Sequence, residues 1–161
     1  MKVCHTEVMK LIKELEEQKS ILISKEDESC TVSFKEGEAK ITNGYNYAET
    51  RQKINEIDAR IRVLRSVLAK ANCTVLVDKF NVTIGEALVM LAQLQNQRAH
   101  LESLARNKQL SRRITMNGVL EFTECLYSTE QAQSDAKALR QTIAELQMCI
   151  DRANLVNFVE I

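Results

Sequence analysis

Apolar residues between Tyr47 and Ala71 recur at alternating steps of three and four, which is the period of a helical heptad rather than a strand. The positions that follow this rule are Tyr47, Thr50, Ile54, Ile57, Ile61, Leu64, Leu68 and Ala71. Arginines and acids occupy the other faces. The pattern predicts a long helix over residues 47–71 that buries its apolar stripe against partner helices.

A second heptad seam lies near the C-terminus. Its members are Ala132, Ala136, Leu139, Ile143, Leu146, Ile150 and Ala153. Ser128 precedes the seam, and Gln131 lies three residues after Ser128, which is the spacing of a capping box. We therefore predict a helix that begins after Ser128.

Two further helices are expected. Apolar residues from Val8 to Leu22 share one face, which predicts a first helix from about Lys2 to about Ser24. Thr83 and Glu86 form a second capping-box pattern, and an apolar face follows to about Lys108. Leu88 and Ala92 widen that face beyond one stripe.

Between the helices, β-prone segments predict short strands near 29–43, 73–80, 111–126 and 155–161. The first alternates apolar and polar residues and is interpreted as a hairpin. In the third, Asn117-Gly118 predicts a two-residue type I′ turn with positive φ at both positions. The last is expected to pair with one of the hairpins, since an apolar terminus is usually tied down.

The fold class predicted is mainly α, with four long antiparallel helices as a helical bundle or coiled-coil hairpins and short β hairpins at the ends. The 161 residues contain no proline, four glycines and 4% aromatic residues, a composition that favours long helices. One domain covering 1–161 is expected from this length.

Charge and cysteine usage narrow the class further. The chain has 22 lysines plus arginines and 22 acids, so it carries no net charge that would attract nucleic acid or anionic lipid. No apolar run approaches the ~18 residues of a membrane span, and the N-terminus lacks the apolar core of a signal peptide. Five scattered cysteines are expected as free thiols. We therefore expect a cytoplasmic protein.

Catalytic and metal-binding patterns are absent from the sequence. It contains no GxGxxG, GxxxxGK[ST], GxSxG or HExxH. His5 adjoins Cys4 but neighbouring helical residues point in different directions. His100 follows Gln97 rather than the glutamate that a helical di-metal site requires. We predict that the protein is not an enzyme and that it has no catalytic site, no metal site and no cofactor.

Candidate interaction residues lie at the start of the 47–71 helix and along it. Tyr45, Tyr47 and Arg51 either line a pocket or anchor the helix start. Arg60, Arg62 and Arg65 belong to the basic region 51–70, and a second basic region covers 98–113, each with a net charge of about plus four. These faces are interpreted as solvated or ion-paired; phosphate binding is the alternative.

The region 45–161 resembles a bacterial family of uncharacterised helical proteins related to septicolysin-like proteins. The resemblance rests on a Tyr-x-Tyr before a Thr-Arg helix, an Asn-x-Thr after it, and a Thr-Ile-x-x-Ala-Leu helix start. The matching positions are Tyr45, Tyr47, Thr50, Arg51, Asn72, Thr74, Thr83, Ile84, Ala87 and Leu88. The septicolysin likeness implies a cytolysin, whereas the residues show neither an export signal nor a membrane-inserting segment.

The leading functional hypothesis is a non-enzymatic structural or protein-interaction module that self-associates through helix faces into a homo-oligomer. An exposed apolar stripe of more than a few hundred Å² is rare in a soluble monomer, which favours this interpretation. One alternative is a nucleic-acid-associated protein using the arginine-rich faces. The other is a membrane-active protein.

Overall fold

The protein is mainly helical. A computed structural model describes residues 1–161, of which 64% lie in four helices. These are α1 (His5–Ser29), α2 (Tyr47–Thr74), α3 (Ile84–Ala105) and α4 (Thr129–Val156). The remaining elements are three antiparallel strand pairs. This confirms a mainly α class with small β excursions, while one antiparallel bundle of all four helices stays a prediction.

Internal contacts divide the chain into two compact units. Unit 1 comprises Met1–Asn72 with Asn154–Ile161, and unit 2 comprises Cys73–Ala153. Each unit has its own cluster of buried apolar side chains, and the two clusters share no residue. The sequence predicted one domain over residues 1–161 and did not predict this division. That the two units fold as one domain stays a prediction.

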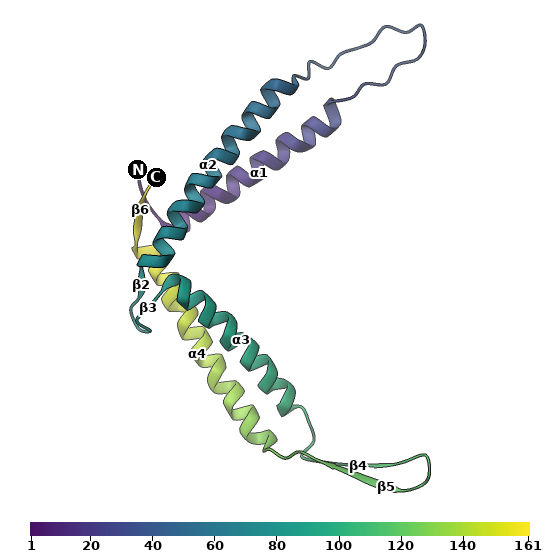
Figure 1. Cartoon of the computed structure of the whole chain (residues 1–161), viewed down its shortest axis with the longest axis vertical. Helices are drawn as coiled ribbons and strands as arrows, with labels where there is room; N and C mark the ends of the chain where they lie inside the picture. The colour runs from purple at the N-terminus through teal and green to yellow at the C-terminus, as the bar shows by residue number, and fades with distance from the viewer. The chain divides into compact units, whose positions relative to one another are not determined.

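In unit 1, α1 and α2 lie side by side (Figure 1). Their buried contacts join Val8 and Ile12 of α1 to Ile61 and Leu64 of α2. Ile61 and Leu64 belong to the predicted seam, so the heptad pattern identified the buried face of α2. The ion pair between Lys19 and Asp58 (N–O 2.7 Å) lies at the edge of this interface.

The two chain ends of unit 1 pair with each other. β1 (Lys2–Cys4) and β6 (Phe158–Glu160) are antiparallel, with Val3 opposite Val159. The C-terminal strand was predicted, but its expected partner, one of the hairpins, was wrong. The predicted first helix likewise begins later than expected, because residues 2–4 form β1.

The hairpin predicted over residues 29–43 is not present. Helix α1 continues through Ser29, and residues 30–46 connect to α2 without a strand. Side chains 31–44 are all exposed, so the alternation of apolar and polar residues has no core to face. A period-2 pattern stabilises a strand only where one face is covered, which explains the error.

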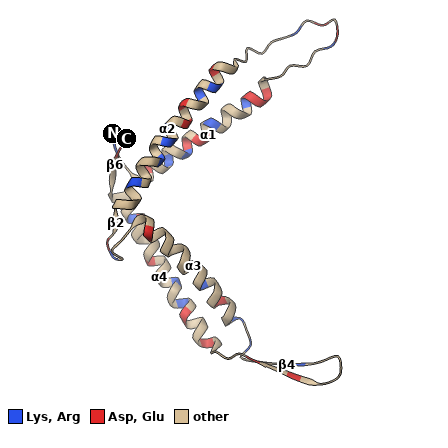
Figure 2. Ribbon diagram, viewed as in Figure 1, with Lys and Arg blue, Asp and Glu red and all other residues tan.

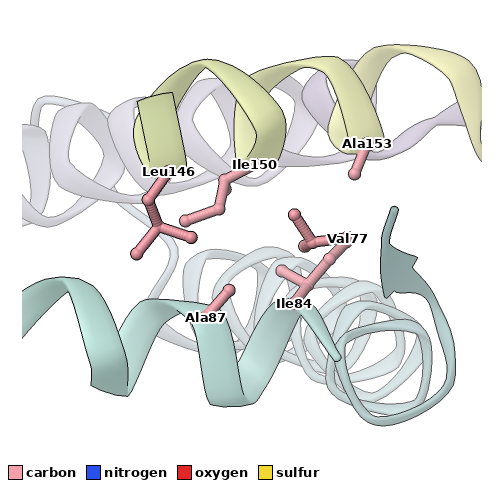
Figure 3. Packing of buried hydrophobic residues seen from close by; sticks show 6 residues of the cluster. All are labelled: Val77, Ile84, Ala87, Leu146, Ile150 and Ala153. Carbon is pink, nitrogen blue, oxygen red and sulfur yellow. The ribbon is translucent and has the colours of Figure 1, made fainter. Parts of the chain in front are cut away.

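Unit 2 packs α3 against α4 (Figure 1). Figure 3 shows its cluster from close by, with side chains of α3 and α4 facing one another and Val77 closing one end. The members are Val77, Ile84, Ala87, Leu146, Ile150 and Ala153. The short pair β2 (Leu76–Val77) and β3 (Val82–Thr83) leads into α3, in and just after the predicted segment 73–80.

A longer hairpin follows α3. It comprises β4 (Leu110–Ile114) and β5 (Leu120–Glu124), within one residue of the predicted segment 111–126. Its turn differs from the prediction: Gly118 has φ 72°, but Asn117 is not in the positive-φ region. The Gly118 N–H donates to the Thr115 carbonyl at 2.9 Å. A three-residue loop with glycine in the left-handed position therefore replaces the type I′ turn.

The predicted helix starts have the expected caps. The Thr83 hydroxyl accepts the Glu86 N–H at 3.2 Å, and the Glu86 carboxylate accepts the Thr83 N–H at 2.8 Å. The bond from the Thr83 N–H, together with a second bond from the Thr83 hydroxyl at 2.9 Å, lowers the pKa of the Glu86 carboxylate. At α4, the Ser128 hydroxyl accepts the Gln131 N–H at 3.1 Å, while the Gln131 side chain bonds Asp135 instead of closing the box.

Candidate functional site

One carboxylate holds together most of the residues predicted at the start of α2. Glu26 lies near the end of α1, and its side chain is only 14% exposed. Its Oε1 accepts a hydrogen bond from the Tyr45 hydroxyl at 2.6 Å, and its Oε2 pairs with the Arg51 guanidinium. The Arg51 guanidinium carbon also lies 6.0 Å from the centre of the Tyr47 ring. Both oxygens of Glu26 are therefore occupied within unit 1.

Asparagines of the connecting loop position this cluster. The Asn43 side chain donates to the Ser29 carbonyl at 2.7 Å and accepts the Tyr45 N–H at 3.2 Å. Asn46 then caps α2, with its side-chain oxygen accepting the Glu49 N–H at 3.3 Å. The loop end is thereby fixed against α1, and Tyr45 is directed towards Glu26.

The geometry of this cluster is that of an anchor. Partial burial, followed by nearby Cys30 and Tyr47, raises the pKa of the Tyr45 hydroxyl, so it remains a hydrogen-bond donor at neutral pH. A shallow hollow of about 220 Å³ adjoins Tyr45 and Glu26 and is lined mainly by polar side chains. Tyr47 is exposed and lies over Arg51 rather than in the hollow. The arrangement holds the ends of α1 and α2 together, and Glu26, which sequence reasoning missed, is its centre.

The three remaining candidates lie along α2 and do not converge. Arg65 pairs with Glu16 of α1, within unit 1. Arg60 lines a shallow hollow with Leu15, and Arg62 is exposed on another face of the helix. In Figure 2, basic and acidic residues intermingle along α1 and α2. The 51–70 region thus presents a mixed surface rather than a basic patch.

The second basic region is also partly neutralised. Arg98 and Glu102 approach to 3.8 Å within α3, and Arg140 of α4 reaches the same carboxylate at 3.2 Å. On the hairpin, Arg113 pairs with Glu121 at 2.5 Å. Glu102 was already included in the linear count of charges for this region, whereas Glu121 lies outside 98–113 along the sequence and was not.

Helix α3 has a second apolar stripe that faces away from its core. Its inner face contributes Ile84 and Ala87 to the buried cluster. Leu88 and Val89 are 44% and 59% exposed, and Ala92 is exposed beside them. No charged residue lies between Glu86 and Arg98, so α3 is largely tan in Figure 2. We call Leu88, Val89 and Ala92 the outer stripe of α3. Leu88 and Ala92 were marked by the sequence as extra apolar positions, whereas Val89 was not.

The helices give no indication of a membrane span: none is both long enough and apolar enough to cross a bilayer.

Comparisons with known proteins identify a shared fold. No family model and no curated protein matches the chain. Among solved structures, the crystal structure of a functionally unknown conserved protein from Corynebacterium diphtheriae is similar, with a TM-score of 0.70 and 18% sequence identity. The match covers 99% of this chain and 100% of that one. At this level of identity the likeness shows the fold alone.

Proposed function

We propose that the protein is a non-enzymatic interaction module that self-associates through helix faces, with the outer stripe of α3 as its contact surface. The observation that supports this most is an apolar surface on both sides of one helix. Residues 87–92 of α3 are apolar on every side, and a helical segment of this kind is normally buried on all sides. Unit 2 covers only one side of this segment, and a second copy that packs on the other side covers Leu88, Val89 and Ala92.

The accessible surface supports an association partner. It totals 12130 Å². Two separate globules, each of about half the 18.3 kDa mass, would expose roughly 9,800 Å² together. The excess of about 2,300 Å² includes the exposed connecting segment 31–44 and the β4–β5 hairpin as well as the outer stripe of α3. A homo-oligomer with closed, twofold symmetry is the commonest way to cover such a surface.

The ion pairs favour self-association over nucleic-acid binding. A nucleic-acid surface presents unpaired Lys and Arg clustered on one face. Here Arg51, Arg65, Arg98 and Arg113 each face an acid of the same unit. Binding phosphates through these four arginines would require breaking those pairs, and the unpaired Arg62 and Arg112 lie in different units. We accordingly expect no salt-sensitive retention on heparin at physiological ionic strength.

The proposal opposes the membrane-active alternative. We propose in addition that the protein is cytoplasmic, as expected from the sequence. An outer stripe buried between copies is unavailable to lipid. We therefore expect no dye release from vesicles of neutral or anionic phospholipid at protein concentrations where the oligomer forms. Leakage from such vesicles would favour the membrane-active function implied by the septicolysin resemblance.

The experiment that tests the proposal places a charge in the outer stripe. Leu88→Glu buries a carboxylate in the contact, which strongly opposes association. The matched control is Gln97→Glu, which adds the same charge to an exposed position of α3 outside the stripe. Light scattering coupled to gel filtration should report a lower mass for Leu88→Glu and the wild-type mass for Gln97→Glu. Equal oligomeric masses for all three proteins would contradict the assignment of the stripe, and circular dichroism checks that the variants remain folded.

A further inference from the structure

The β4–β5 hairpin has one apolar face that nothing in the chain covers. Directly opposed residues of an antiparallel pair point to the same face. Ile114 lies opposite Leu120, Arg112 opposite Phe122 and Leu110 opposite Glu124. These six residues therefore share one face, which we call the hairpin face. Its four apolar side chains are 49–73% exposed.

The opposite face is polar and already satisfied. Ser111 lies opposite Thr123, and Arg113 pairs with Glu121 at 2.5 Å. A two-stranded hairpin of this kind is marginally stable alone and needs a further layer on its apolar face. The amphipathic pattern thus indicates a cover for the hairpin face and none for its reverse.

The base of the hairpin is fixed to the helices of unit 2. The Tyr127 hydroxyl donates to the Leu104 carbonyl at 3.0 Å and accepts the Asn107 side-chain amide at 2.6 Å. Gln109 donates to the Cys125 carbonyl at 2.9 Å. These bonds anchor both strands where they leave α3 and approach α4, so the hairpin face is presented in a defined direction rather than on a free loop.

The charges on the hairpin face point to its occupant. Arg112 and Glu124 sit among the apolar residues, and neither forms an ion pair or side-chain hydrogen bond within the chain. We propose that the hairpin face packs against the hairpin face of a second copy of this chain. A twofold axis parallel to the strands places β4 of one copy over β5 of the other.

This arrangement accounts for the two charged residues of the face and for three of its four apolar residues. At the usual spacing of about 10 Å between packed sheets, Arg112 lies over Phe122 of the second copy and beside its Glu124. The symmetry forms this ion pair twice, while Ile114 and Leu120 pack on their counterparts. A strand added at the hairpin edge would satisfy backbone groups but would leave the apolar face in water, so edge addition does not explain the pattern.

The contact deepens the proposed function and rests on it. Neither the six side chains of the hairpin face nor the three of the outer stripe of α3 bury the ~1,600 Å² of a standard interface, so the two contacts act together in the oligomer of the proposed function. Disrupting the hairpin face should accordingly weaken the assembly rather than abolish it.

The test is a charge-swap complementation between two variants. Arg112→Glu leaves only acids on the hairpin face, and Glu124→Arg leaves only bases. Each variant alone then opposes like charges in both ion pairs, and we expect its Kd for self-association to rise about tenfold. An equimolar mixture restores both pairs and should recover the wild-type Kd. The control is Arg113→Glu, which reverses a charge on the polar face and should associate as the wild type does.

Light scattering across a dilution series distinguishes the outcomes. Wild-type mass in each single variant, or no recovery in the mixture, would overturn the hairpin contact while leaving oligomerisation through α3 in place. A wild-type protein that stays at 18.3 kDa would overturn the proposed function and this contact together. The contact predicts a raised Kd for self-association in each variant alone and the wild-type Kd in the equimolar mixture.

Discussion

Leu64→Ala and Leu146→Ala probe whether the two units have separate cores. Leu64 of α2 is 1% exposed and lies in the unit 1 cluster, and Leu146 of α4 is fully buried in the unit 2 cluster. The clusters share no residue. Each substitution should therefore destabilise its own unit, although α2 and α4 continue from one unit into the other.

The magnitude follows from the burial. Truncating a fully buried leucine to alanine costs about 2–5 kcal/mol, from lost transfer free energy and the cavity left behind. A unit of about 80 residues has roughly 4–12 kcal/mol of stability. Either substitution removes a large share of that margin. Exchange of core amides that requires unfolding of the affected unit should accelerate about 30-fold or more.

Hydrogen exchange followed by mass spectrometry separates the two units, because α1 lies wholly in unit 1 and α3 wholly in unit 2. Leu64→Ala should reduce protection in α1 peptides much more than in α3 peptides. Leu146→Ala should give the reverse. Equal losses in both helices for either variant would refute the reasoning and show one cooperative core. Thr142→Ala, at a partly exposed position of α4, serves as a mild control.

The remaining predictions concern the turn, the anchor and the cap. Gly118→Val should destabilise the hairpin by about 1 kcal/mol or more because φ is positive at Gly118, whereas Asn117→Ala should be nearly neutral. Hydrogen exchange of the hairpin amides measures both effects, and equal effects would contradict the turn geometry. Tyr45→Phe loses its bond to the buried carboxylate of α1 and should lower Tm by a few degrees, while Tyr47→Phe should leave Tm unchanged, as scanning calorimetry would show. The pKa of Glu86 is lowered in the folded state, so its stabilising bond is present above the usual pKa of 4.5 and lost as pH falls through the folded value. Urea titrations at successive pH values should therefore show the difference between wild type and Glu86→Gln shrinking on acidification; a constant difference would contradict the cap.

The local sequence predicted the elements whose stabilising pattern is itself local. The seam through Ile61 and Leu64 located the buried face of α2, and Thr83 with Glu86 located the start of α3. Asn117-Gly118 located the hairpin although not its turn type, because only the glycine adopts positive φ. Periodicity and capping depend on neighbours within four residues, so they can be recognised without the fold.

Features that depend on distant contacts were missed. β1 is three residues long and forms only because the C-terminal strand, about 155 residues later, pairs with it. The segment 29–43 alternates like a strand but has no layer to face. Glu26 lies in a polar run typical of a solvated helix end, and its role appears only when the loop brings Tyr45 and Arg51 beside it. In each case the outcome depends on a contact with a distant part of the chain, which periodicity does not specify.

The mass of the wild-type protein in solution tests the central claim most directly. Light scattering coupled to gel filtration reports mass independently of shape, so a tenfold dilution series at micromolar concentration separates a monomer from an assembly. Self-association through α3 predicts a mass of at least twice 18.3 kDa at the higher concentrations, falling only on dilution through the Kd. A constant 18.3 kDa across the series would contradict the account and leave the outer stripe of α3 exposed to water.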